Sequence, residues 1–281
     1  MTNALTKGER ITYLVTGGAG SLGNVLVDKL VKSGEKIRSQ DIYEAGLSKQ
    51  KKRYPASQYT AIYGSITDYN KCLLAADGVS KIIHTAAMKN LDITEQSIPA
   101  MIETNIQGTL NVALAAKENH IDTAILISSD KAVEPTTAYG ASKLMGEHIW
   151  KWAARIQGWT KYVIVRSGNF FESAGNVFEV WNEQNDNNEP LTLTDPEMER
   201  YFIESKELAD IIVSICNDPT VKNGDLIVPR MGKWKIIDLL KIRYPNCKYK
   251  VTGARLGEKM SESLTYDFEK MEKRENYYIV R

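Results

Sequence analysis

The stretch ITYLVTGGAGSLG, from Ile11 to Gly23, decides the fold of this 281-residue chain. The run that ends at Thr16 is mostly apolar and β-branched, which is typical of a buried strand. Three glycines follow at three-residue intervals, and the amphipathic segment from Asn24 to Ser33 predicts a helix. A strand, a glycine-rich turn and a helix in this order let the backbone approach a pyrophosphate, which then lies on the positive end of the helix. The predicted dinucleotide contacts in this turn are Gly17, Gly20, Ser21, Leu22 and Gly23.

A second strand is expected from Lys36 to Ile42, and it carries an acidic residue. Asp41 stands about 20 residues past the glycines, where a carboxylate can accept a hydrogen bond from a ribose 2′-hydroxyl and so favours NAD. Arg38 lies three positions earlier, and a basic run follows from Lys49 to Arg53. These cations would also allow the 2′-phosphate of NADP, so the sequence leaves the choice between the two cofactors open.

Further strand-like runs alternate with helical segments as far as the middle of the chain. This alternation predicts an α/β fold, a doubly wound parallel sheet with ligands at the carboxyl edge of its strands. A long helix with an apolar face is expected from Pro99 to Asn119, interrupted by Asn105 and Gly108. His84 is expected to be an interior histidine. The further strands are predicted at Tyr59 to Ile66, Lys81 to Ala87, Ala124 to Ile127 and Tyr162 to Asn169, and the residues expected at the cofactor edge are Ser65, Ile66, Ala86, Ala87, Lys89 and Asn105.

Beyond Phe170 this alternation stops. The polar segment from Trp181 to Glu189 predicts a loop, Glu204 to Cys216 a helix and Asp225 to Pro229 a strand. We therefore expect a dinucleotide-binding Rossmann domain made of residues 1–169 plus about 201–229. Residues of about 170–200 plus 230–281 are expected to form a small substrate lobe.

The stretch ISSDKAVEPTTAYGASK, from Ile127 to Lys143, carries most of the candidate chemistry. Tyr139 and Lys143 are four residues apart, so both side chains lie on one face of the expected helix. A neighbouring ammonium favours the phenolate, so Tyr139 can act as a base near neutral pH. Taken alone, Tyr-x-x-x-Lys also arises by chance on amphipathic helices, and the glycine-rich turn is what favours the catalytic interpretation.

Composition excludes several classes of function. The formal net charge is +1, with 43% hydrophobic residues, so neither a nucleic-acid nor a membrane surface is indicated. Cys72, Cys216 and Cys247 are far apart, which fits a reducing compartment and no structural metal site. The chain shows no apolar run long enough to cross a bilayer. We expect a soluble, cytoplasmic protein without membrane insertion.

Several motifs together resemble one family of enzymes. They are VTGGAGSLG at Val15 to Gly23, HTAAMKN at His84 to Asn90, ETNIQGTLNV at Glu103 to Val112, SSDKAVEPTTAYGASKL at Ser128 to Leu144, VRSGNF at Val165 to Phe170, MERYFI at Met198 to Ile203 and RLGEKMSE at Arg255 to Glu262. The chain resembles an extended short-chain dehydrogenase/reductase. Within that superfamily it resembles the inverting UDP-N-acetylglucosamine 4,6-dehydratases (5-epimerising) of bacterial polysaccharide and flagellin-glycan biosynthesis. Asp-Lys-Ala at Asp130 to Ala132 is the specific part, because 4-epimerases usually carry small hydroxyl residues there.

The resemblance implies a role for each matching side chain. Tyr139, with its pKa lowered by Lys143, would remove the 4-hydroxyl proton while hydride leaves C4, and Ser129 would orient the 4-oxygen. Lys131 would then act as a base at C5, and Asp130 would protonate the departing 6-hydroxyl. Reprotonation from the opposite face inverts C5. Lys131 must be a neutral amine for this role, which requires a pKa depressed by burial or by Lys89 and Lys143.

The resemblance also implies the ligands. A tightly held NADP or NAD is regenerated in each cycle, a UDP-sugar is the substrate, and relatives commonly form homo-oligomers. The residues implied to bind the substrate are Lys89, Asn169, Arg255 and Glu258. The loop after Asn169 departs from the family pattern because Glu172 adds a negative charge. Two alternatives stay open at this point: a UDP-hexose 4-epimerase, and a non-catalytic protein that binds nucleotide sugars or the cofactor.

Overall fold

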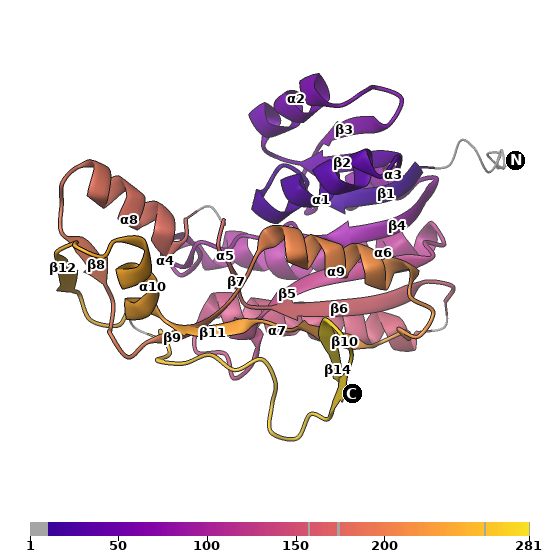
Figure 1. Ribbon diagram of the computed structural model, residues 1–281. Coiled ribbons are helices and arrows are strands. Elements are labelled where there is room, and N and C mark those ends of the chain that lie inside the picture. The colour runs from indigo at the N-terminus through magenta and orange to yellow at the C-terminus, as the bar shows by residue number, and fades with distance from the viewer. Residues whose placement is uncertain (1–10, 157, 173–174, 256, 281) are drawn as a thin grey trace, which may run out of the picture.

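The computed structural model describes residues 11–156, 158–172, 175–255 and 257–280. Within these residues a nine-stranded sheet runs through the centre of the molecule (Figure 1). Its strands in spatial order are β13 (Met271–Lys273), β14 (Tyr277–Val280), β10 (Leu226–Pro229), β6 (Lys161–Ser167), β5 (Thr123–Ser129), β4 (Val79–His84), β1 (Ile11–Thr16), β2 (Ile37–Asp41) and β3 (Tyr59–Tyr63). Pairing is parallel from β10 to β3, and β14 and β13 add antiparallel strands at one edge. The predicted doubly wound parallel sheet is confirmed.

Helices cover both faces of this sheet. The helices beside the sheet are α1 (Ser21–Lys32), α2 (Glu44–Arg53), α3 (Tyr69–Ala76), α6 (Thr109–Glu118), α7 (Ala138–Arg155) and α9 (Ser205–Asn217). Side chains alternate between the two faces along each strand. In β1, Tyr13 and Val15 pack into the core that contains α1 and α9, whereas Leu14 packs into the core that contains α3, α6 and α7.

The helix predicted from Pro99 to Asn119 has an irregular middle. It consists of α5 (Ile98–Met101), a π-helical stretch η1 (Ile102–Gly108) and α6, and the short α4 (Leu91–Thr94) precedes it. Asn105 and Gly108, the two residues noted as interruptions, both lie in η1. A methyl group at Gly108 would come within 2.6 Å of the Ile66 side chain, so the missing Cβ lets this stretch approach the turn that follows the strand β3 (Tyr59–Tyr63).

His84 ends β4 inside the protein, as the sequence predicts. Its side chain is 1% exposed, and its ring nitrogens are 2.6 Å from Thr16 Oγ1 and 3.1 Å from Thr109 Oγ1. Burial, and to a smaller extent the charge of Lys143, lower the pKa of His84 to about 3. The ring is therefore neutral and fully paired, which is a structural role.

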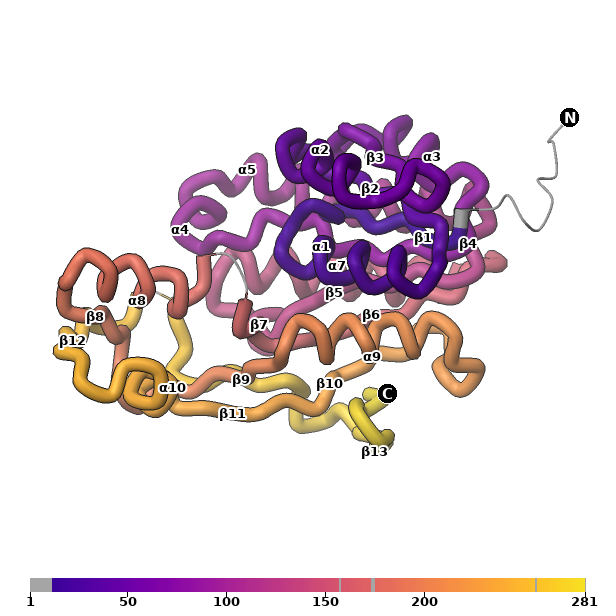
Figure 2. Tube along the Cα trace, turned by 45° about the horizontal axis from the view of Figure 1, so that its top comes forward, coloured from indigo at the N-terminus to yellow at the C-terminus, as the bar shows by residue number. Residues whose placement is uncertain are grey.

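A smaller lobe projects from the carboxyl end of the main sheet, at the left of Figures 1 and 2. It contains α8 (Val177–Asp186), α10 (Ile236–Arg243), a sheet of β11 (Gly232–Lys235), β9 (Glu199–Ile203) and β7 (Asn169–Phe170), and a pair of β12 (Tyr249–Val251) with β8 (Leu191–Leu193). Its own apolar core includes Trp181, Leu240 and Phe202.

Two expectations about this region are corrected. The loop predicted from Trp181 to Glu189 is wrong, because most of it belongs to α8. That helix is capped by the side chain of Asn176, which accepts from the Glu179 amide at 3.1 Å, and it buries Trp181 completely. Residues 271–280, expected in the substrate lobe, instead form β13 and β14 of the main sheet. The remaining division into two domains stays a prediction.

Candidate active site

The catalytic stretch lies where β5 ends at the carboxyl edge of the sheet. A short 3-10 turn, η2 (Asp130–Ala132), follows the strand, and α7 begins after it with Thr137 as its N-cap, which accepts from the Gly140 amide at 3.1 Å. A Cβ at Gly140 would overlap the carbonyl oxygen of Lys131. Glycine at this position therefore lets the η2 turn pack directly onto the first turn of α7, which brings Asp130 and Lys131 toward Tyr139.

Asp130 is a buried carboxylate with one oxygen occupied and one without a partner. Its Oδ1 accepts from Ser129 Oγ at 2.8 Å and lies 3.2 Å from the ammonium of Lys131. Its Oδ2 is buried and makes no hydrogen bond to any described residue. A buried acceptor without a partner is costly, so this oxygen is suited to carry a proton or to contact a ligand.

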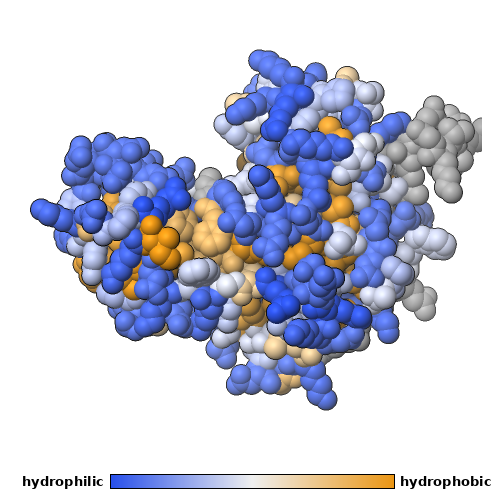
Figure 3. Space-filling view, viewed as in Figure 1, coloured by the Kyte–Doolittle hydropathy of each residue, from blue (hydrophilic) through white to orange (hydrophobic). Residues whose placement is uncertain are grey.

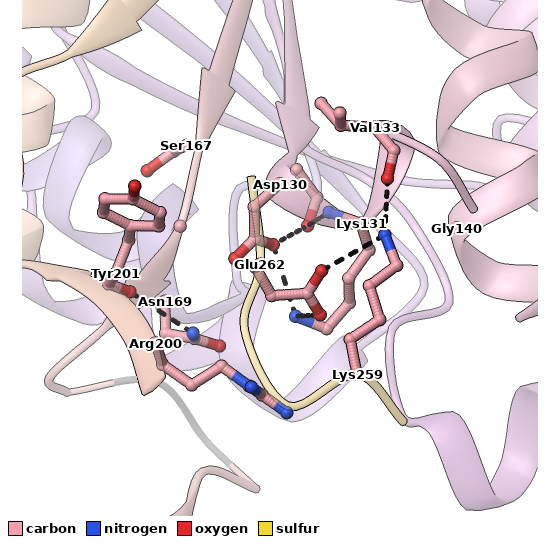
Figure 4. Close-up of polar contacts among 12 residues, drawn as sticks. Asp130, Lys131, Val133, Gly140, Ser167, Asn169, Arg200, Tyr201, Lys259 and Glu262 are labelled. Carbon is pink, nitrogen blue, oxygen red and sulfur yellow. Dashed lines mark hydrogen bonds and ion pairs between the residues drawn. The ribbon is translucent and has the colours of Figure 1, made fainter. Parts of the chain in front are cut away.

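Lys131 lies between two carboxylates (Figure 4). Besides Asp130, Glu262 Oε1 is 3.5 Å from its Nζ. Burial on its own lowers the pKa of Lys131, but Asp130 and then Glu262 outweigh burial and raise this pKa above 10.5. The expected depression of this pKa by burial or by the nearby Lys89 and Lys143 is therefore not found, because the two carboxylates outweigh burial.

Tyr139 lies close enough to this ion pair to be affected by it. Burial raises the pKa of Tyr139 above 10, Lys131 opposes this increase, and a hydrogen bond with Ser129 also lowers the pKa. Lys143 instead donates to the Ile127 carbonyl at 2.6 Å, and burial lowers its pKa to about 8. Lys131 is thus a cation that lowers the pKa of Tyr139 in this structure, and the effect expected from Lys143 stays a prediction.

The glycine-rich turn has the shape that a dinucleotide needs. Gly17 has a φ of +70°, and a Cβ there would lie 2.6 Å from the Ala86 amide nitrogen. A Cβ at Gly23 would overlap the Gly17 carbonyl oxygen, so the helix packs tightly under the turn. The first turn of α1, which includes Ser21 and Leu22, has no acidic residue, and Gly20 provides no side-chain cap. The positive end of α1 is therefore open to an anion.

Asp41 lies against this turn, and Arg38 does not. Asp41 Oδ2 accepts from the Ala19 amide and its Oδ1 from the Tyr43 amide, both at 2.9 Å. Arg38 donates to three carbonyls at the end of α3, those of Leu74, Ala75 and Asp77, at 2.6–3.2 Å. Side chains that are three apart on a strand point to opposite faces. Arg38 therefore caps α3 and is held away from the Asp41 carboxylate.

The other predicted cofactor residues lie in different settings. Ser65 Oγ accepts from the Thr67 amide at 3.1 Å, whereas the Ile66 side chain is buried in the core. Ala86 and Ala87 follow β4 beside the glycine turn. Burial lowers the pKa of Lys89, and Glu179 of α8 opposes this change, which places the Lys89 ammonium toward the small lobe.

Asn105 connects two walls of the site. Its side chain accepts from the Met88 amide at 2.7 Å and donates to the Met88 carbonyl at 2.9 Å and to Ser142 Oγ at 3.0 Å. These contacts join the loop after β4 to α7, the helix that carries Tyr139. The contacts of Asn105 in this structure are structural.

The predicted substrate residues line the small-lobe side. Asn169 donates to the Tyr201 carbonyl at 3.3 Å. Arg255 is exposed, with its guanidinium 3.6 Å from the carboxylate of Asp92. Glu258 accepts from the Arg255 amide at 3.2 Å and lies 3.4 Å from the guanidinium of Arg200. Two ion pairs, Arg255 with Asp92 and Arg200 with Glu258, thus border this side.

Glu172, the departure from the family loop, has a structural partner. Its Oε2 accepts from the amide and from the hydroxyl of Ser205, at 3.1 and 2.6 Å, so it caps the start of α9. Glu172 also borders a cavity of about 560 Å³ between α8 and the start of α1. Figure 3 shows apolar side chains gathered between the small lobe and the main body. Residues 173 and 174 of this loop lie outside the described residues.

Sequence reasoning missed three charged residues at the site. All three are in quoted motifs, Arg200 in MERYFI and Lys259 and Glu262 in RLGEKMSE, but no spacing rule connects them to Lys131. The C-terminal segment reaches the η2 turn through hydrogen bonds from Lys259 to the Val133 carbonyl at 2.6 Å and from Tyr266 to the Ala132 carbonyl at 3.1 Å. The motif RLGEKMSE was therefore the available signal.

The described part of the chain contains neither a cluster of metal-ligating side chains nor a helix that could span a membrane. No group of three or more His, Cys, Asp or Glu side chains in it is arranged to hold a metal ion. None of its helices is long and apolar enough to cross a membrane.

Together these features define an α/β enzyme of the extended short-chain dehydrogenase/reductase type, acting on nucleotide sugars. The chain belongs to the family described as polysaccharide biosynthesis protein, which matches residues 13–281. A UDP-N-acetylglucosamine 4,6-dehydratase (inverting) of Campylobacter jejuni is 31% identical over 95% of this chain and 81% of that protein. A UDP-glucose 4-epimerase of Rickettsia bellii is 32% identical over 96% of this chain and 82% of that protein. The solved structure of Pen from Bacillus thuringiensis has a TM-score of 0.89 and 25% identity, over 97% of this chain and 90% of that one.

Proposed function

We propose that this protein converts UDP-N-acetylglucosamine to a UDP-4-keto-6-deoxy-N-acetylhexosamine with inversion at C5, as a step in glycan biosynthesis. The observation that carries the proposal is the ion pair of the buried Asp130 with the partly buried Lys131, 3.2 Å apart, beside Tyr139 at the carboxyl edge of the sheet. An acid, an amine and a phenol around one small volume match the three proton movements of this reaction. The similarity to the Campylobacter dehydratase supports the same reading.

The glycine turn fits NAD or NADP, because the missing side chains at Gly17 and Gly23 and the open end of α1 leave space for a pyrophosphate. Asp41 would hold the adenine ribose, and Ser65 would lie near the adenine. Lys143 would contact the nicotinamide ribose with the N–H groups that it does not give to Ile127. When bound, the nicotinamide supplies the hydride acceptor for C4 and the hydride donor for C6.

Tyr139 takes the proton of the 4-hydroxyl at its phenolic oxygen. Ser129 orients the 4-oxygen, since it already hydrogen bonds with Tyr139 and with Asp130. The resulting ketone acidifies the proton on C5, which is why oxidation comes first. Lys131 removes that proton at Nζ, provided that its amine is neutral. Asp130 enters this step protonated at Oδ2 and gives that proton to the 6-hydroxyl, which leaves as water. The Lys131 ammonium, 3.2 Å away, then returns a proton to Asp130, and a proton from solvent adds to C5 from the opposite face.

The UDP moiety lies toward the small lobe in this proposal. Arg255 suits a diphosphate, because a guanidinium can donate two parallel hydrogen bonds to phosphate oxygens. Asn169 and Glu258 line the same side, and Lys89 approaches from the loop after β4. Association into a homo-oligomer stays a prediction.

Product analysis after incubation with UDP-N-acetylglucosamine tests the proposal. Loss of water and a new 6-methyl signal in the proton NMR spectrum support it. The second candidate is a 4-epimerase, which the 32% identity to the Rickettsia enzyme favours. Formation of UDP-N-acetylgalactosamine with no methyl signal would replace the first proposal by the second, and substrate binding with no turnover would leave only a binding protein.

A further inference from the structure

A carboxylate from the C-terminal segment reaches Lys131 from far along the chain. Glu262 is 5% exposed, and its Oε1 is 3.5 Å from Lys131 Nζ. Its Oε2 is 3.6 Å from Lys259 Nζ and makes no hydrogen bond to the described residues. Figure 4 shows the Glu262 carboxylate between the two lysine ammonium groups. Glu262 is thus held beside Lys131 by its contacts with two lysines, and the proposed function gives Glu262 no role.

The charges around Lys131 create a difficulty for its role as a base. The groups that face it are Asp130 of its own turn, Glu262 and Lys259 of the C-terminal segment, Arg200 of β9 and Tyr139 of α7. The two carboxylates keep Lys131 protonated at neutral pH, since its pKa is raised above 10.5. If Lys131 could lose this proton only to water, few protein molecules would carry a neutral Lys131 amine at neutral pH. A proton acceptor next to Lys131 would provide another route to the neutral amine.

Glu262 is better suited to accept this proton than Asp130. Asp130 Oδ1 already accepts from Ser129 and Lys131, and in the proposed reaction Asp130 gives a proton to the leaving hydroxyl. Glu262 has no proton to give in that reaction. Burial on its own favours the neutral amine and the neutral acid over the two charged groups, so excluding water from the site lowers the free-energy cost of this proton transfer.

We propose that Glu262 is a positioning residue for Lys131. Glu262 accepts a proton from the Lys131 ammonium, and this leaves the neutral amine that acts at C5. This inference rests on the proposed function. In the transfer, an Nζ–H bond of Lys131 breaks and an Oε1–H bond of Glu262 forms. The nitrogen lone pair that is left forms a new N–H bond with the C5 proton, and the C5–H electrons pass into the enolate of the 4-keto sugar. No other reactant is needed.

The test measures deuterium entry at C5 in D2O with UDP-N-acetylglucosamine, alongside oxidation at C4, for wild-type protein and Glu262→Gln. We expect wild-type exchange to vary little with pH near neutrality. Glu262→Gln is expected to oxidise C4 at the wild-type rate but to exchange C5 at least tenfold more slowly at neutral pH, with exchange that recovers as the pH rises. Glu262→Asp keeps an acceptor and should keep the flat pH profile at reduced rate.

Tyr266→Phe is the matched control, because it removes a hydrogen bond from the same segment to the η2 turn without touching Lys131. It is expected to keep the wild-type pH profile. The inference is overturned if Glu262→Gln exchanges deuterium at C5 as fast as wild type at neutral pH. It is also overturned if the exchange rate of Tyr266→Phe shows the same pH dependence as that of Glu262→Gln. If Glu262→Gln loses C4 oxidation through misfolding, a Glu262→Asp profile that rises with pH overturns it. Wild-type protein that neither oxidises C4 nor exchanges C5 instead refutes the proposed function, and the inference falls with it.

Discussion

A methyl group at Gly140 should lower the catalytic rate strongly and the stability of the fold only slightly. Its Cβ would overlap the Lys131 carbonyl oxygen and come within 3.1 Å of Pro135 Cβ. Non-bonded carbon atoms pack at about 3.5 Å or more, so the η2 turn must move by roughly 1 Å. Overpacking of this kind costs about 1–3 kcal/mol, against a helix-propensity gain of about 1 kcal/mol. A shift of roughly 1 Å in a catalytic group lowers the rate by about 100-fold.

We therefore expect Gly140→Ala to lose about 0–2 kcal/mol of unfolding free energy and about 100-fold in turnover. Gly146→Ala is the matched control on the same helix, because its Cβ would meet Leu126 and Thr109 at 3.6 and 3.8 Å, which are ordinary contacts. Chemical denaturation and product NMR give the two quantities. A Gly140→Ala protein that is more stable than wild type and turns over normally would refute the packing argument.

Three further predictions concern single side chains. Tyr139→Phe should abolish C4 oxidation, and because burial raises the pKa of Tyr139, the wild-type oxidation rate should rise with pH above neutrality; a fully active variant would contradict this. Since Asp41 faces the glycine turn and Arg38 caps α3, the protein should bind NAD about tenfold more tightly than NADP. Asp41→Asn should reduce this difference in affinity. Equal dissociation constants of the wild type for NAD and NADP would exclude Asp41 as the residue that selects the cofactor. His84 has a pKa lowered from 6.5 to about 3, so the unfolded chain binds a proton that the folded chain does not. The unfolding free energy should fall as the pH drops through this window, by about 1.4 kcal/mol per pH unit from this residue, and an unchanged slope in His84→Asn would argue against it.

Local sequence patterns were enough to predict the strands and the long helical segment of the N-terminal half of the chain. The strand from Ile11 to Thr16 has the bounds that were expected, because a β-branched run that stops at a glycine leaves little choice of conformation. Asn105 and Gly108 were recognised as unfavourable inside a helix, and both lie in the π-helical stretch. Such features depend on neighbours within a few residues.

Features that depend on distant neighbours could not be predicted. The segment after Trp181 is polar in sequence, and its helix forms because Trp181 and Phe178 bury against strands of the small lobe. The last strand, Tyr277–Val280, is fixed by pairing with Leu226–Pro229. The pKa of Lys131 depends on burial and on charges from separate segments of the chain. Glu262 is distant in sequence, so the direction in which the pKa of Lys131 shifts could not be predicted from the residues around Asp130.

The central claim is that the Asp130–Lys131 pair removes water from an oxidised sugar nucleotide. A single-turnover measurement on Lys131→Ala with UDP-N-acetylglucosamine tests it most directly, by following the reduced nicotinamide absorbance together with the 6-methyl signal. We predict that C4 oxidation proceeds, the reduced cofactor accumulates, and neither C5 deuterium nor the methyl signal appears. A Lys131→Ala protein that forms the 6-methyl product at the wild-type rate would contradict the claim.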